Sequence, residues 1–155
     1  MELHRDFKEL LASFNAHGVE YILVGAYALA FHGAPRYTGD LDLFVRPTPE
    51  NARRIIAALG DFGFGSLGLG VEDFTSPDRV VQLGVPPVRV DLVTSLTGVS
   101  WDEVWSARAD MSADGIRIAV INRAAFIKNK RATGRPKDLV DAGLIDTDEG
   151  TPRPD

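Results

Sequence analysis

Apolar residues recur along this chain with two different periods, and the change from one period to the other marks the predicted elements. Residues 3–16 carry apolar side chains at helical spacing with charged residues between them, which predicts an amphipathic helix. Residues 21–24 form a continuous apolar run of the length of a buried strand. The same reading predicts further helices over 26–32, 49–60, 101–107, 123–132 and 136–144, and further strands over 40–46, 79–85, 88–93 and 116–121.

The order of these elements predicts the fold class. Single strands alternate with helices at first, and two adjacent strands follow at 79–93, so the chain is α/β in the broad sense and closer to α+β. A small mixed β-sheet with helices packed on it fits this order. We find no internal repeat and no linker, so residues 1–145 are predicted to form one domain. Residues 146–155 are polar, acidic and rich in Pro and Gly, which predicts a disordered acidic tail.

Several element boundaries carry their own local signals. Thr48 is a predicted N-cap, and Pro49 suits the first helical position after it. Ser100 and Glu103 have the spacing of a capping box, in which each side chain satisfies a backbone N–H of the other residue. The pair at 86–87, two prolines, separates two strands and predicts a hairpin.

The composition narrows the class of protein. The chain has 155 residues, 45% of them hydrophobic and 25% charged, with no cysteine and a formal net charge of −5. The lack of cysteine excludes disulfides and zinc–thiolate sites and fits a reducing cytoplasm, which is the predicted location. No signal peptide and no membrane-spanning run are expected. The negative charge disfavours broad non-specific nucleic-acid binding, although residues 123–137 hold six basic and no acidic residues.

The candidate chemistry starts at Asp40 and Asp42, which lie inside the apolar strand 40–46. Successive side chains of a strand alternate between faces, so both carboxylates point to one face while the leucines between and after them can be buried. Two neighbouring carboxylates repel each other unless a positive charge lies between them. A divalent cation with oxygen ligands, most often Mg²⁺, supplies that charge. The plainer alternative is a solvated strand face or a turn.

Two further features favour a metal site over that alternative. Asp91 offers a third carboxylate within the apolar strand 88–93. The apolar strand 21–24 runs directly into Gly25 and then into a predicted helix. The first backbone N–H groups of a helix have no partner within the helix, so a tight turn at Gly25 and Ala26 can bind phosphate oxygens. Together these features predict a metal-dependent site that handles phosphate groups.

These motifs resemble the DNA polymerase β-type nucleotidyltransferase superfamily. Its pattern is a small-residue turn at a helix start, an Asp-x-Asp on the next strand and a third Asp on a later strand. The segment 126–141 is similar to the ending of a small prokaryotic branch that includes the AbiEii-type toxins, and the resemblance spans roughly residues 5–145. One departure is Ala26, where the superfamily commonly has Ser or Gly, because alanine has no hydroxyl for a phosphate oxygen.

The resemblance implies a role for each matching position. Two Mg²⁺ ions, or Mn²⁺, would be held by the three carboxylates, and Asp91 would also orient or deprotonate the acceptor hydroxyl. The remaining candidates are nucleotide-binding residues: Gly25, Ala26, Arg36, Thr38, Lys128 and Lys130. The alternative for the two lysines is a solvated basic helix face. Asp138 lies in the first turn of the predicted helix 136–144, where its negative charge could serve only to favour the helix dipole.

The resemblance implies a magnesium-dependent transfer of a nucleoside monophosphate from an NTP such as ATP to a hydroxyl. The acceptor is open among an RNA end, a protein side chain and a small molecule, and a cognate toxin or antitoxin partner is open as well. The alternative is a non-catalytic binding module of a toxin–antitoxin system that keeps the fold. Ala26 is the one sequence feature that favours this alternative. A magnesium phosphatase or nuclease is a third reading, disfavoured by the turn at Gly25.

Overall fold

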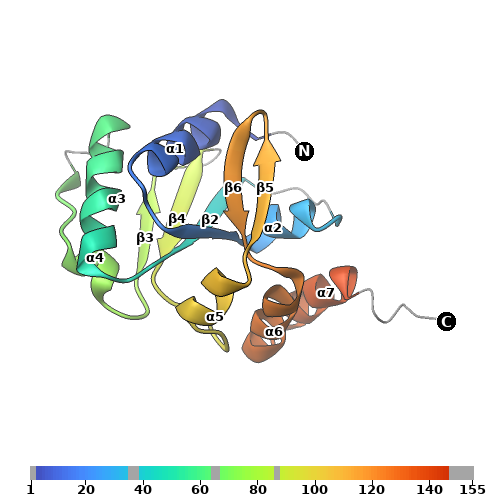
Figure 1. Cartoon of the computed structure of the whole chain (residues 1–155). Helices are drawn as coiled ribbons and strands as arrows, with labels where there is room; N and C mark the ends of the chain where they lie inside the picture. Colours follow the sequence, from blue (N-terminus) through green and yellow to red (C-terminus); the bar gives the residue numbers. More distant parts are fainter. Residues whose placement is uncertain (1–2, 35–38, 64–66, 86–87, 147–155) are drawn as a thin grey trace.

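The centre of the protein is a six-stranded mixed sheet in the order β3-β4-β2-β1-β6-β5 (Figure 1). The computed structural model describes residues 3–34, 39–63, 67–85 and 88–146. Parallel pairing joins β2 to β4 and β1 to β6, whereas the other neighbouring strands are antiparallel. The strands are β1 (Tyr21–Val24), β2 (Asp40–Val45), β3 (Val80–Leu83), β4 (Arg89–Val93), β5 (Ala109–Ala113) and β6 (Ile116–Val120).

The helices pack on both faces of this sheet. Phe14 of α1 contacts Tyr21 of β1, and Trp101 of α5 contacts Phe44 of β2, whose side chains lie on opposite faces by register and alternation. α3 lies beside α1, while α6 and α7 form a pair near α5 (Figure 1). The helices are α1 (Arg5–Ala16), α2 (Gly25–Phe31), α3 (Pro49–Asp61), α4 (Glu72–Thr75), α5 (Trp101–Ser106), α6 (Arg123–Thr133) and α7 (Pro136–Ile145).

Local signals in the sequence set several helix starts. The Thr48 side chain accepts a hydrogen bond from the Asn51 N–H, and Pro49 occupies the first turn of α3. The Ser100–Glu103 capping box is present at α5. These predicted boundaries are confirmed because a cap needs only residues within one turn of the chain.

The alternation predicted for β2 is also confirmed. Leu41 and Leu43 are fully buried on one face, whereas Asp40 and Asp42 on the other face remain partly exposed. β1 is buried on both faces because it lies inside the sheet, where helices pack on each side. β2 therefore turns its leucines to the core and keeps its two carboxylates partly open to solvent on the other face.

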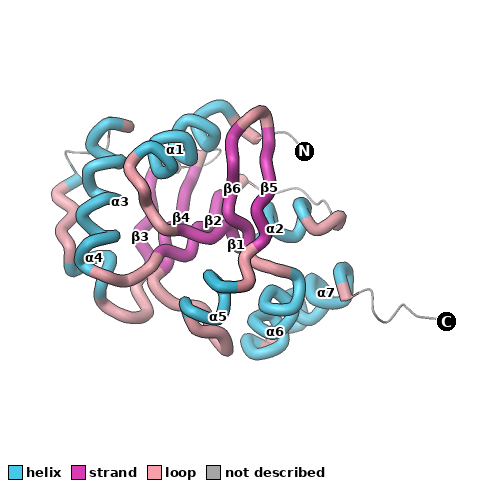
Figure 2. The backbone as a smooth tube through the Cα atoms, viewed as in Figure 1, coloured by secondary structure: helices cyan, strands magenta, loops and turns pink. Residues whose placement is uncertain are grey.

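Two elements were missing from the predicted order. Residues 109–113 form β5, which makes a hairpin with β6 at one edge of the sheet (Figure 2). The turn between them is Asp114-Gly115, both with positive φ, and this dipeptide is a strong hairpin signal that the prediction missed. The short helix α4 follows residues 60–70, which contain five glycines in the sequence. The predicted fold class, a mixed sheet with packed helices, is correct although these two elements were not predicted.

Asp146 is the first residue of the predicted tail. Asp146 pairs with Arg131 of α6 at the end of α7. The predicted tail residues after it lie outside the described part of the chain. Within the described part, no helix combines the length and the apolar character that crossing a membrane requires.

Candidate active site

The parallel pairing of β2 and β4 brings the three predicted carboxylates together. Asp42 lies opposite Asp91 in register, and Asp40 lies opposite Arg89. Residues that are opposite one another on neighbouring strands point to the same face, so all three carboxylates share one face of the sheet. Asp91 is buried, with 9% of its surface exposed, while Asp40 and Asp42 are half-buried. The structure therefore places the three carboxylates on one face of neighbouring strands, and their role as metal ligands stays a prediction.

Arg89 lies within this cluster and was not among the predicted site residues. Its Nε donates to Oδ1 of Asp91 at 3.1 Å and its Nη2 donates to Oδ2 at 3.0 Å, a bidentate pair. Its Nε also lies 3.9 Å from Oδ2 of Asp40. The available signal was its position two residues before Asp91, which puts both side chains on one strand face.

Asp42 carries the electrostatic cost of the cluster. Burial, and then the charges of Asp91 and Asp40, raise the pKa of Asp42 from 3.8 to about 6, although Lys130 and Arg89 act in the opposite direction. A carboxylate with a raised pKa is one that a further positive charge would stabilise in its ionised form. The arrangement thus favours binding of a cation close to Asp42.

The donor set suits a hard divalent cation by its chemistry. Three carboxylates supply the oxygen ligands that Mg²⁺ and Mn²⁺ prefer, and their mutual repulsion shows in the pKa of Asp42. Over the described residues, no group of three or more His, Cys, Asp or Glu side chains is arranged as a metal site. The Arg89 guanidinium supplies the countercharge at this place. Asp40, Asp42 and Asp91 fit a metal ion by ligand type and number, while both oxygens of Asp91 accept hydrogen bonds from Arg89.

Gly25 brings the start of α2 against Asp42. Its φ is +74°, and a Cβ built on it would lie 3.1 Å from Cβ and Cγ of Asp42 and nearer still to Oδ2. α2 begins at Gly25, one residue earlier than predicted, and Ala26 falls in its first turn. The turn is therefore held next to the carboxylates by a contact that only glycine permits. Arg36 and Thr38 lie outside the described residues.

We expect Gly25→Ala to lower the free energy of unfolding by about 2–4 kcal/mol. The energetic cost of a positive φ at alanine and the cost of the clash between its Cβ and Asp42 are expected to add. Gly18→Ala is the matched control, since Gly18 has φ +71° and its nearest neighbour for an added Cβ lies 3.8 Å away. Chemical denaturation of both variants separates the two effects. Equal losses in the two variants would show that the close approach to Asp42 contributes nothing.

A pocket of about 240 Å³ opens beside Asp42 and Gly25. One wall is the end of the sheet, and the opposite wall comes from α6 and the start of α7. Lys130 lines this pocket and its charge reaches Asp42, so of the two predicted lysines it is the one at the site. The polar residues of the lining are Asp42, Ser95, Thr97, Asn129, Lys130, Thr133 and Arg135.

Asp138 holds the basic wall of this pocket in place. Its side chain accepts hydrogen bonds from Arg135 Nε at 2.6 Å and from Thr133 Oγ1 at 2.6 Å, and Lys130 Nζ lies 3.6 Å away. Burial alone would raise the pKa of Asp138, but these hydrogen bonds and the charge of Lys130 outweigh it and lower the pKa to about 2. Only 1% of the residue is exposed. Asp138 therefore does more than favour the dipole of α7, because it is the shared acceptor of a buried polar network.

Lys128 points away from this pocket and pairs with Glu103 of α5 at 2.7 Å. Arg131 is three residues after Lys128 and so lies on the same helix face, and it pairs with Asp146. Most of the basic residues of 123–137 thus have acidic partners, which weakens the case for this segment as a nucleic-acid surface. Lys128 fits the alternative of a surface residue better than nucleotide binding.

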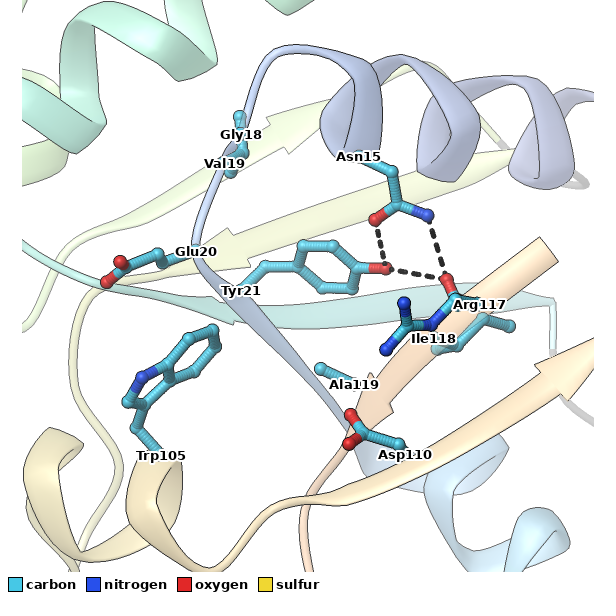
Figure 3. Close-up of a pocket in the computed structure, with 10 residues that line it drawn as sticks. All are labelled: Asn15, Gly18, Val19, Glu20, Tyr21, Trp105, Asp110, Arg117, Ile118 and Ala119. Carbon is cyan, nitrogen blue, oxygen red and sulfur yellow. Dashed lines mark hydrogen bonds between the residues drawn. The ribbon is translucent and has the colours of Figure 1, made fainter.

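A second pocket, of about 340 Å³, lies between the end of α1, β1, β6 and α5 (Figure 3). Asn15 bridges Tyr21 and the Arg117 carbonyl in its wall, with Nδ2 donating to the carbonyl at 2.8 Å and Oδ1 accepting from the tyrosine hydroxyl at 3.1 Å. Burial raises the pKa of Tyr21 to about 12, so this hydroxyl stays protonated. None of the three carboxylates lines this pocket, whereas Asp42 lines the pocket of about 240 Å³ beside Gly25.

Comparisons with known proteins agree with this geometry. The model of a family described as "Nucleotidyl transferase AbiEii toxin, Type IV TA system" matches residues 9–154. No curated protein sequence matches the chain.

Several solved structures share the fold at low sequence identity. The protein TM1012 of Thermotoga maritima has 14% identity and a TM-score of 0.57, over 94% of this chain and 87% of that one. ANT(2")-Ia, solved in complex with adenylyl-2"-tobramycin, has 14% identity and a TM-score of 0.57, over 93% and 87% of the two chains. The lincosamide antibiotic adenylyltransferase LnuA, solved with lincomycin, has 12% identity and a TM-score of 0.53, over 94% and 97%. At these identities the likeness concerns the fold.

Proposed function

This chain belongs to the AbiEii nucleotidyltransferase toxin family, and from that premise we propose that it is a divalent-metal-dependent enzyme that transfers a nucleoside monophosphate from an NTP to a hydroxyl group. The observation that carries the proposal is the register of β2 and β4, which sets Asp42 beside Asp91 with Asp40 on the same face. A binding module without catalysis would have no need of three repelling carboxylates beside a buried layer.

The residues of the site divide the work of such a transfer. Asp40, Asp42 and Asp91 would hold Mg²⁺ or Mn²⁺, which when bound neutralises phosphate charge and lowers the pKa of an attacking hydroxyl. Asp91 would accept the proton of the acceptor hydroxyl as its oxygen bonds to the α-phosphorus and the bond to pyrophosphate breaks. Lys130, held by Asp138, would bind the triphosphate from the opposite wall of the pocket.

The turn at Gly25 would complete the phosphate site. It lies against Asp42, so a triphosphate that contacts its backbone N–H groups would also lie next to the carboxylates. Ala26 offers no hydroxyl, which leaves the backbone and Lys130 as the donors. The non-catalytic binding module of a toxin–antitoxin system remains the second candidate, and Ala26 is the feature that favours it.

The acceptor follows less directly from the structure. Family membership makes a role in a toxin–antitoxin pair the first candidate, with an RNA end or a protein side chain as acceptor. The solved relatives named for antibiotics share the fold only, so a small-molecule acceptor rests on that likeness. The basic residues of α6 give limited support to an RNA acceptor because Lys128 and Arg131 are already paired.

A labelling experiment tests the proposal. The protein is incubated with each α-labelled NTP and Mg²⁺, together with total cellular RNA or total protein, and the products are separated. We expect label from at least one NTP to appear in one class of acceptor, and to disappear with EDTA. Binding of NTP, seen as a thermal shift, without transfer to any acceptor would favour the non-catalytic module instead.

A further inference from the structure

Arg89 is a basic side chain that is bonded directly to the carboxylate cluster. It forms a bidentate pair with Asp91 and approaches Asp40, and it lies opposite Asp40 in the strand register. Against the three negative charges of the cluster it contributes one positive charge in direct contact. Lys130 also lines the pocket, and its ammonium group pairs with Asp138 at 3.6 Å.

The contacts of Arg89 use the oxygens that a metal ion would need. Both carboxylate oxygens of Asp91 accept a hydrogen bond from the guanidinium, at 3.1 and 3.0 Å. A cation bound between Asp42 and Asp91 would face that guanidinium across the same carboxylate, and two positive charges at such short range repel strongly. Arg89 and a divalent cation thus compete for the same negative charge.

The position of Arg89 allows it to move. The Arg89 side chain is 31% exposed, and the side chain of its partner Asp91 is 13% exposed. The guanidinium of Arg89 therefore lies on the more open side of the cluster. An arginine side chain has four rotatable bonds. A divalent cation that compensates the charge of Asp91 lets the guanidinium turn towards water without leaving that buried carboxylate unpaired. The strand backbone that carries it is fixed in the sheet by its pairing with β2.

We propose that Arg89 is a positioning residue that holds Asp91 and Asp40 in the metal-free protein and is displaced by the divalent cation, so that it sets the cation affinity of the site. This inference rests on the proposed function, which supplies the cation. Arg89 lowers the electrostatic repulsion among the carboxylates before metal arrives. It also makes metal binding weaker than the carboxylates alone would give.

The test uses Mn²⁺ alone as the probe and the full chain as the protein. Free Mn²⁺ is measured by electron paramagnetic resonance in titrations of the wild type, Arg89→Ala and Arg89→Lys. We expect Arg89→Ala to bind Mn²⁺ about five- to tenfold more tightly than the wild type, because the competing charge is gone. Arg89→Lys keeps a charge without the bidentate fork and should lie between the two.

Thermal unfolding supplies a second readout that separates this role from a structural one. In EDTA, Arg89→Ala should unfold at a lower temperature than the wild type, and saturating Mn²⁺ should remove most of that difference. A purely structural arginine would lower the unfolding temperature equally in both conditions. Arg79→Ala is the matched control, because Arg79 forms a similar ion pair of 2.8 Å with Asp73 away from the carboxylates.

Unchanged or weaker Mn²⁺ binding by Arg89→Ala would overturn the inference, as would the absence of Mn²⁺ binding by both proteins. The labelling experiment keeps the two proposals apart. Label transfer by the wild type together with unchanged Mn²⁺ affinity in Arg89→Ala would leave the transferase standing without this role for Arg89. Tighter binding by Arg89→Ala with no transfer from any NTP would support the countercharge and contradict the enzyme.

Discussion

Asp42→Asn is expected to lose nucleotidyl transfer by at least about a thousandfold, the equivalent of about 4 kcal/mol in the barrier. The amide has no negative charge for a cation and replaces the carboxylate at the centre of the cluster, where Asp91 lies opposite in register. In EDTA at pH 8, the same substitution should raise the free energy of unfolding by about 1–2 kcal/mol. It removes a half-buried charge that Asp91 and Asp40 repel.

The pH dependence gives the direction of this stabilisation. The pKa of Asp42 is raised from 3.8 to about 6, so its ionised form is less stable in the folded protein than in the unfolded chain. That cost is fully present above about pH 6 and vanishes below about pH 4. The advantage of Asp42→Asn over the wild type should therefore shrink as the pH falls from 6 to 4. It is measured by denaturant unfolding across that range.

Asp110→Asn is the matched control for Asp42→Asn. Asp110 also lies on a strand, but its side chain is 64% exposed. It lies opposite Ala119 in the strand pairing, and Arg108 lies 3.9 Å from it. The control should change neither transfer nor stability beyond about 0.5 kcal/mol. An Asp42→Asn protein that unfolds more easily than the wild type at pH 8 in EDTA would show that Asp42 serves the fold instead.

Asp138→Asn should lower the free energy of unfolding by about 2–4 kcal/mol and reduce transfer as well. The substitution removes the negative charge that two buried or partly buried donors face, Thr133 and Lys130. Lys130 is 18% exposed and would be left without its partner on the pocket wall. We expect weaker NTP binding because this ammonium group then loses its fixed position.

The pKa of Asp138, lowered to about 2, predicts how the wild type responds to acid. The ionised carboxylate is more stable in the folded protein, so its contribution is present above about pH 4 and is lost as the pH falls towards 2. Asp138→Asn should therefore flatten this part of the stability profile, measured by denaturant unfolding between pH 2 and 5.

Asp102→Asn separates the buried network from a helix-dipole effect. Asp102 occupies the first turn of α5, as Asp138 occupies that of α7, but it is exposed. A loss of stability similar in both variants would contradict the network, because a dipole effect at an exposed first turn contributes only about 0.3–1 kcal/mol. A much larger loss in Asp138→Asn would support it.

The sequence by itself determined those features that depend on near neighbours in the chain. The face shared by Asp40 and Asp42 follows from strand alternation, and the start of α3 follows from Thr48 and Pro49. The turn at Gly25 could also be predicted, because the apolar strand 21–24 runs directly into this glycine. The hairpin at Asp114-Gly115 was equally local and could have been predicted from its dipeptide.

Only the tertiary structure decided which distant residues meet. The pairing of β2 with β4 joins segments about fifty residues apart, and a shift of one residue would have put Asp91 on the opposite face from Asp42. The burial of Asp138 depends on how α6 packs against α7, which helical periodicity does not specify. Charge composition likewise does not say that Arg89 approaches Asp40, because this 3.9 Å distance depends on the pairing of β4 with β2.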